Sequence, residues 1–282
     1  MVRRIWQEKR LLGRLFIAAT ALAVLLFGAT QQDQYVTVTT ALNDETSAIA
    51  KQGLDTVGRL TLLVGMGATG GFNGSMSETQ KVYFTFLYVL IGLTTVWLLR
   101  HRLAGNEVKV RDGLYSASGP VVTIALLFLV AILQLIPLAL AVITYSAAIT
   151  SGVLTGPFEK TFFAILTGLI CIGSLYWVMS TVVAAMVATN PGTYPVAALK
   201  AARNVVAGRR AQLMMHLVWL ALLVALIWAL VLIPATIVDN WVHQQFLPFT
   251  VGSIQLLTSF SVIFVSAYVY LLYRKMIDEP TN

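Results

Sequence analysis

The stretch PVVTIALLFLVAILQLIPLALAVITY, residues 120–145, decides the fold class because it contains no charged side chain. A transmembrane helix needs about 20 mostly apolar residues to cross roughly 30 Å of hydrocarbon. Five further long runs of the sequence also lack Asp, Glu, Lys and Arg, namely 15–32, 82–99, 161–199, 211–238 and 240–273. Because a charge at mid-bilayer costs about 2.5–3.5 kcal/mol, these runs predict an all-α integral membrane protein. We expect a single membrane domain, 1–282, with six transmembrane helices near 12–30, 82–99, 120–145, 161–189, 212–238 and 249–273.

The composition excludes a soluble globular domain. Hydrophobic residues make up 58% of the 282 residues, charged residues only 11%, and the mean hydropathy is +0.80. Soluble domains carry about 25% charged residues. The single cysteine, Cys171, lies inside a predicted span and is interpreted as a small buried residue.

The distribution of cations predicts the orientation. The chain has 19 Lys and Arg residues, and most of them lie before the first predicted span, after the second, between the fourth and fifth, or after the sixth. Only Lys51, Arg59, Lys81 and Lys160 lie in the alternate segments. Cytoplasmic loops carry the excess of Lys and Arg, so we expect both termini in the cytoplasm. The net charge of +7 is then explained by anionic lipid headgroups as the partner, and nucleic acid is not expected as one.

The first apolar run also has the basic start of a signal peptide. Phe27-Gly28-Ala29 and Gly28-Ala29-Thr30 are poor cleavage sites, which favours an uncleaved signal anchor. The following segment, 31–81, is predicted to be an extracytoplasmic loop with an amphipathic helix. Within it, 60–72 is apolar but too short to cross, so it is expected to lie on the membrane or on the bundle, or to be re-entrant.

The predicted spans suggest three helical hairpins, each preceded by a basic amphipathic segment. Leu-Ile-Pro occurs near the outer end of two of them, at 135–137 and at 232–234. Pro137 and Pro234 are candidate kinks or helix ends, because proline removes a backbone donor. The residues Ser146 to Pro157 are rich in Ser, Thr and Gly and are interpreted as an outer loop.

The segment 191–211 is predicted to be a cytoplasmic basic amphipathic helix. At 100° per residue, Lys200, Arg203 and Arg210 share one face, and Val196, Leu199 and Val206 take the other. The segment is either a connector that obeys the positive-inside rule or a docking site for anionic lipid or a protein partner at the cytoplasmic face. The candidate contacts are Lys200, Arg203, Arg209, Arg210, Arg100, Arg102 and Arg111.

A resemblance accompanies this segment. The resemblance rests on Ala198-Leu199-Lys200, Arg203 and Arg209-Arg210 leading into Leu213, together with Val110 to Tyr115 before the third predicted span. Over roughly 105–273 the chain resembles poorly characterised multi-spanning bacterial membrane proteins: the YciC-like inner-membrane family and the membrane domain of some glycerophosphodiester phosphodiesterases. The resemblance implies a bacterial cytoplasmic (inner) membrane location. No phosphodiesterase domain is present in the sequence, so that activity is not carried over.

Few polar side chains lie inside the predicted spans. Gln134 is expected to form an interhelical hydrogen bond, with a substrate contact as the alternative. His216 is expected to be interfacial, with a lipid-phosphate contact as the alternative. Ser180, Ala184 and Ala188 recur every four residues, which indicates a packing face within the chain or between protomers.

The sequence contains no HExxH, GxSxG or Walker-type motif and no Cys/His cluster, so no catalytic, metal or cofactor site is predicted. A non-catalytic membrane protein with an envelope, assembly or partner-scaffolding role is the first hypothesis. The second is a transporter or channel for an uncharged or lipidic substrate. The third is an intramembrane lipid-modifying enzyme.

Overall fold

The computed structural model describes residues 8–27, 78–152, 156–190, 192–241 and 249–278. Over these residues the chain is entirely helical, with no strand. They divide into two compact units, Met1–Ser116 with Trp219–Tyr268, and Ala117–Val218 with Val269–Asn282. Each unit is described by itself below, as the first unit and the second unit.

Within the described residues, five helical segments are long and apolar enough to cross a membrane, which makes the chain a multi-pass α-helical membrane protein. They are Thr79–Leu103, Val121–Ile149, Pro157–Ala188, Arg210–Ala235 and Gly252–Asp278. The first predicted span corresponds to α2 (Lys9–Phe27), which has 19 residues and lies outside this group of five.

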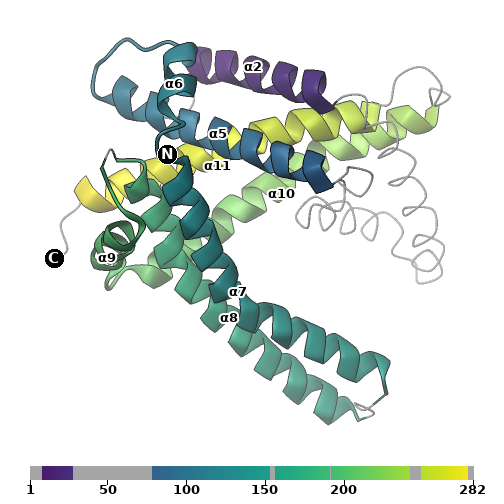
Figure 1. The fold of residues 1–282 in the computed structure, drawn as a ribbon. Coiled ribbons are helices and arrows are strands. Elements are labelled where there is room, and N and C mark those ends of the chain that lie inside the picture. Colours follow the sequence, from purple (N-terminus) through teal and green to yellow (C-terminus); the bar gives the residue numbers. More distant parts are fainter. Residues whose placement is uncertain (1–7, 28–77, 153–155, 191, 242–248, 279–282) are drawn as a thin grey trace. The chain divides into compact units, whose positions relative to one another are not determined.

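The first unit contains α2, α5 (Glu78–Leu103) and the short α6 (Val110–Ser116), which pack against one another (Figure 1). Apolar residues of α2 at helical spacing, Leu12, Leu15, Ala19 and Ala23, are buried in one cluster with Leu87, Ile91 and Leu98 of α5. Glu8, just before α2, forms an ion pair with Arg102 near the end of α5, with 3.1 Å between Oε2 and Nε. The start of α2 therefore lies beside the end of α5, and the two helices are antiparallel.

The other helices of the first unit come from the C-terminal part of the chain. They are residues 219–241 of α10 (Arg210–Trp241) and residues 249–268 of α11 (Phe249–Asp278). α5 and α11 approach closely at Gly92, where a Cβ atom would come within 2.9 Å of the Ser266 hydroxyl. Small residues at such positions let helices approach closely and allow interhelical hydrogen bonds.

The second unit is built on a hairpin of two long helices, α7 (Val121–Thr150) and α8 (Pro157–Ala188) (Figure 1). α8 starts with Pro157 at its first turn, and the Glu159 carboxylate accepts a hydrogen bond of 3.2 Å from the backbone N–H of Gly156. The connection is shorter than the sequence predicted, because α7 runs on to Thr150. Ser146 to Thr150 are helical and not part of a loop; inside a bilayer, helical pairing is what satisfies their backbone groups.

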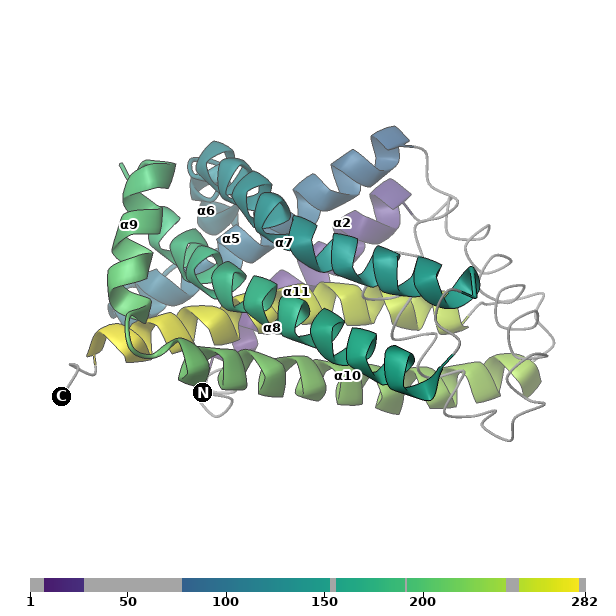
Figure 2. The same ribbon diagram turned by 90° about the horizontal axis from the view of Figure 1, so that it is seen from below.

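The helix α9 (Pro195–Val206) packs against α8 of the hairpin (Figure 2). The contact is made by small residues. The face of α8 that carries Ala184 and Ala188 is fully buried, as are Ala198 and Ala202 of α9. Ala side chains let helix backbones approach closely. The stripe containing Ser180, Ala184 and Ala188 therefore packs within this chain.

The two prolines inside helices do not end them. α7 continues for more than three turns beyond Pro137, and α10 continues beyond Pro234 to Trp241. The alternative that either proline ends its helix is therefore wrong. Neighbouring helices and local adjustments re-satisfy the backbone groups that proline releases in a membrane. The predicted amphipathic helix of 31–81 and the apolar 60–72 lie outside the described residues, which resume in α5 at Glu78.

Candidate functional site

The predicted basic helix of 191–211 is divided into two helices. α9 ends at Val206, and Gly208, with φ of +76°, makes the turn that leads into α10 at Arg210. Only glycine adopts this left-handed conformation without a steric penalty. Arg210 therefore lies on a different helix from Lys200 and Arg203, and the prediction that the three share one helix face is wrong.

The buried face of α9 also differs from the predicted one. Ala198, Ala202 and Val206 are buried, whereas Val196 is 77% exposed. Lys200 and Arg203 are exposed, as expected for the cationic face. Of the predicted apolar face, Val206 is buried and Leu199 is half-buried. Ala198 and Ala202 complete the buried face, and their small side chains let helix backbones approach closely. The exposed face thus combines an apolar residue with two cations, which suits a membrane interface.

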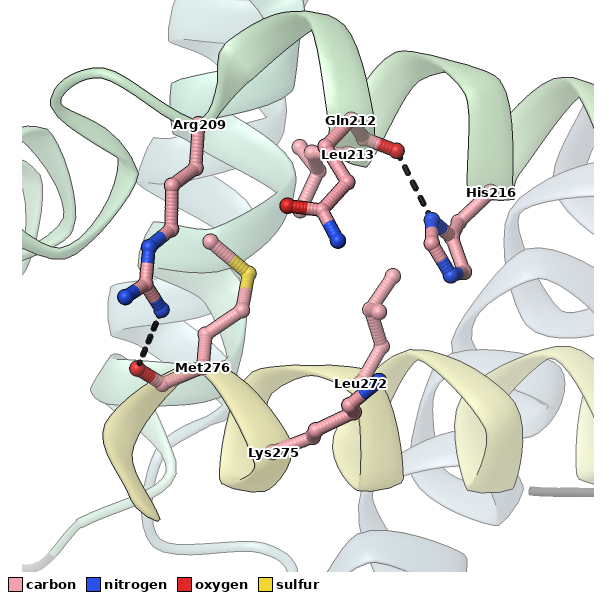
Figure 3. A pocket seen from close by; sticks show the side chains of 7 residues that line it. All are labelled: Arg209, Gln212, Leu213, His216, Leu272, Lys275 and Met276. Atoms are coloured by element: carbon pink, nitrogen blue, oxygen red, sulfur yellow. Dashed lines mark hydrogen bonds between the residues drawn. The ribbon is translucent and has the colours of Figure 1, made fainter. Parts of the chain in front are cut away.

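Within the second unit, the start of α10 lies beside the end of α11, and a pocket lies between them. Figure 3 shows that its walls come from one side of each helix. The lining residues are Arg209, Gln212, Leu213 and His216 from the α10 side and Leu272, Lys275 and Met276 from α11. Their spacing of three and four residues places them on one face of each helix.

Arg209 joins the two walls of this pocket. Its guanidinium Nη1 donates a hydrogen bond of 3.4 Å to the carbonyl oxygen of Met276, two residues before the end of α11 (Figure 3). The last carbonyl groups of a helix have no partner within the helix and carry its negative dipole end. A cation there stabilises the end of α11 and is itself held at the pocket.

The other polar wall is formed by Gln212 and His216. The Nδ1 atom of His216 lies 2.8 Å from the backbone carbonyl of Gln212 (Figure 3). Because a carbonyl oxygen only accepts hydrogen bonds, Nδ1 carries the proton. His216 is half-buried in this pocket, at a helix start rich in cations, where the sequence predicted an interfacial residue.

Arg210 lies outside the pocket. Its guanidinium carbon is 5.0 Å from the centre of the Tyr176 ring of α8, a cation–π distance. Tyr176 is 40% exposed and forms this contact on the surface of the second unit.

In the first unit, the predicted cationic contacts gather at the end of α5 and at α6. Arg102 pairs with Glu8, and Arg111 of α6 lies 3.9 Å from the neighbouring Asp112. Arg100 is half-buried in the last turn of α5. Cations at a helix C-terminus complement its dipole, so part of this charge has a structural role.

Gln134 forms interhelical hydrogen bonds inside the α7–α8 hairpin. The Thr181 hydroxyl donates to its side-chain oxygen at 2.7 Å, and the Ser174 hydroxyl donates to its backbone carbonyl at 2.6 Å. Both partners are buried residues of α8. These bonds hold α7 to α8 close to Pro137, where the helix lacks one backbone donor.

Sequence reasoning missed a second polar cluster, inside the first unit. The Gln255 amide of α11 donates a hydrogen bond of 3.0 Å to the Tyr88 hydroxyl of α5, which lies 3.3 Å from the Ser259 hydroxyl. All three residues are buried. Gln255 and Ser259 are four residues apart, which was a visible signal for one helix face. Their partner helix, α5, could not be found from that spacing.

A smaller polar contact joins α10 to α11 in the same unit. The Trp228 indole N–H donates a hydrogen bond of 2.8 Å to the Ser261 hydroxyl. Leu232, Ile254 and Leu257 form a buried cluster beside it.

No family model, curated protein or solved structure matches the chain. Among the described residues, no group of three or more His, Cys, Asp and Glu is arranged to hold a metal ion. The pocket lined by Arg209 and Lys275 is therefore interpreted from its own residues.

Proposed function

We propose that this chain is a six-span protein of the bacterial cytoplasmic membrane with both termini in the cytoplasm. Its role is non-catalytic: it serves envelope maintenance, assembly or the scaffolding of a partner complex. Its basic cytoplasmic face binds anionic lipid headgroups and a protein partner. The carrying observation is that, in each unit, helix ends rich in cations lie beside one another.

In the first unit, the ion pair between Glu8 and Arg102 joins the start of α2 to the end of α5. In the second unit, the hydrogen bond from Arg209 to Met276 joins the start of α10 to the end of α11. All four helix ends carry Lys or Arg in or beside their terminal turns. Helices that cross a bilayer in opposite directions bring such ends to one side, and the excess of Lys and Arg marks that side as cytoplasmic.

The geometry of α2 supports its role as the sixth span. Its 19 residues extend about 28 Å at 1.5 Å per residue, close to the hydrocarbon thickness of roughly 30 Å. One face packs on α5, while Ile17, Val24 and Leu25 are at least half exposed. Such side chains suit contact with lipid tails.

The pairs α2 with α5, α7 with α8 and α10 with α11 form the three hairpins of this proposal. α6 and α9 are the short helices that precede the second and third hairpins. We include in this proposal the resemblance of the chain to YciC-like inner-membrane proteins and to the membrane domain of glycerophosphodiester phosphodiesterases.

A transporter of an uncharged or lipidic substrate is the second candidate function. It is favoured by the buried polar cluster of Tyr88, Gln255 and Ser259 within α5 and α11, because polar side chains inside a membrane often mark substrate paths. Uptake into vesicles that contain the purified protein would support it. An intramembrane lipid-modifying enzyme is the third candidate, for which the expected readout is turnover of a labelled lipid.

The orientation is tested with reporters that are active on only one side of the membrane. A reporter fused after Asn282, or inserted at Asn106, should report the cytoplasm. One inserted within 31–77, or near Asp239, should report the exterior. An exterior signal at Asn106 or Asn282 would refute the proposed topology and with it the basic cytoplasmic face.

A further inference from the structure

We propose that the mouth of the pocket between the start of α10 and the end of α11 binds the phosphate group of one anionic lipid. This inference rests on the proposed function, since it requires this end of the second unit to lie at the cytoplasmic headgroup layer. It adds a defined site and a ligand class to what would otherwise be a diffuse basic surface.

The charge of the pocket favours an anion. Arg209 and Lys275 stand on opposite walls, and none of the seven lining residues is acidic. The one acidic side chain of α11, Asp278, lies 3.8 Å from Arg274, which is outside the pocket. Arginine and lysine are the usual phosphate-binding cations.

The polar groups at the mouth add hydrogen-bond donors to these charges. Gln212 is exposed and presents its amide beside the pocket (Figure 3). An amide group supplies two N–H donors to a phosphate oxygen. His216 lies one turn further along α10, and its Nδ1–H is already bonded to the Gln212 carbonyl, so the added donors come from Gln212.

The floor of the pocket favours a lipid over a soluble phosphate. Leu213 and Leu272 close it from inside and are almost fully buried. On the outer side of α10, Met215 is 69% exposed and Val218 is 50% exposed. A phosphate held by Arg209 and Lys275 would therefore have apolar helix surface within one or two turns, where its acyl chains can lie.

The size of the pocket limits what it can recognise. It encloses about 20 Å³, which is room for about one water molecule. A headgroup must therefore bind with its phosphate at the mouth and its alcohol outside. We expect the site to distinguish anionic from zwitterionic lipids, and not one anionic headgroup from another.

The test measures lipid association with the full-length protein in phosphatidylcholine bilayers. Spin-labelled phosphatidylglycerol and spin-labelled phosphatidylcholine are compared by electron spin resonance, which gives their relative association constant. For Arg209→Gln with Lys275→Gln, we expect the preference for phosphatidylglycerol to fall about fivefold for each cation removed. The matched control, Arg10→Gln with Lys109→Gln, removes the same charge from two exposed side chains outside the pocket and should change the preference by less than about twofold.

A second pair of variants keeps the bond from Arg209 to the end of α11. Gln212→Glu adds a negative charge of nearly the same shape at the mouth and should weaken phosphatidylglycerol binding by a similar factor, about fivefold. Asn204→Asp adds the same charge on the exposed face of α9 and should have little effect. These variants decide the question if the double variant proves unstable.

Equal losses in the pocket and control variants would overturn the pocket and leave the diffuse basic face of the proposed function intact. A soluble source is tested by titrating inorganic phosphate and glycerol phosphate against the spin-labelled lipid. Displacement by either at millimolar concentration would show a soluble phosphate site and overturn the lipid assignment. The reporter experiment tests the topology independently of lipid binding. A failure of the proposed topology is therefore distinguished from a failure of the proposed lipid site.

Discussion

The helices α5 and α11 differ from the hairpin of α7 and α8 in what surrounds them. Within their most apolar windows, about half of the residues of α5 and α11 are buried, 50% and 56%, whereas only 11% are buried in α7 and in α8. The polar residues of the first pair, Tyr88, Gln255 and Ser259, are sealed between helices. The hairpin instead exposes large apolar side chains along both helices.

This difference shows two ways in which a membrane-spanning helix can accommodate polar side chains. A span surrounded by protein can carry polar residues, provided that they are paired, because unpaired polar groups in hydrocarbon cost several kcal/mol. A span that faces lipid needs an apolar surface and keeps its few polar side chains on the contact side. Gln134, Thr181 and Ser174 follow this second rule.

The largest effect is expected from a substitution that disrupts the close approach of α5 to α11. In Gly92→Leu, the new side chain meets Ser266 at a Cβ distance of 2.9 Å, and overpacking of this kind costs about 2 kcal/mol. Gly173→Leu in α8 is the matched control, because no atom lies within 4 Å of its added Cβ. Reversible unfolding in detergent and denaturant measures both, and equal losses would contradict the distinction between the two regions.

A smaller effect is expected from removing one buried amide from each region. Gln255→Leu should lower the free energy of unfolding by about 1 kcal/mol, within the range for hydrogen bonds between membrane helices. It leaves the buried Tyr88 hydroxyl with Ser259 as its remaining partner among these contacts. Gln134→Leu should lower it by about 0.5 kcal/mol, because Gln134 is only half-buried. The same unfolding measurement would contradict this ranking if Gln134→Leu were the more damaging.

The smallest effect is expected at the ion pair between α2 and α5. Glu8→Gln removes the carboxylate that faces Arg102, whose side chain is 44% exposed. An exposed pair of this kind contributes about 0.2–1 kcal/mol and is screened by salt. The difference in unfolding free energy between the wild type and Glu8→Gln should therefore shrink at high ionic strength. A difference that does not depend on salt would exclude the electrostatic explanation.

The sequence by itself determined the class of the protein and the approximate position of its helices. Charge-free runs of sufficient length predict spans without any knowledge of partners, since the insertion energy depends on each segment alone. The helices α5, α7, α8, α10 and α11 overlap the predicted ranges for this reason. Gln134 was identified in the same way, as a polar residue in an apolar span.

Only the tertiary structure decided which faces meet. Gly208 and its turn separated Arg210 from Lys200 and Arg203, although an uninterrupted helix would have put them together. Lys275 and Arg209, 66 residues apart in the sequence, line one pocket because α10 and α11 are antiparallel there. Tyr88 of α5 contacts Gln255 and Ser259 of α11 because these two helices pack together. The spacing of residues in the sequence shows which side chains share one face of a helix. A site between helices also depends on how the helices pack against one another, which the sequence of one segment does not show.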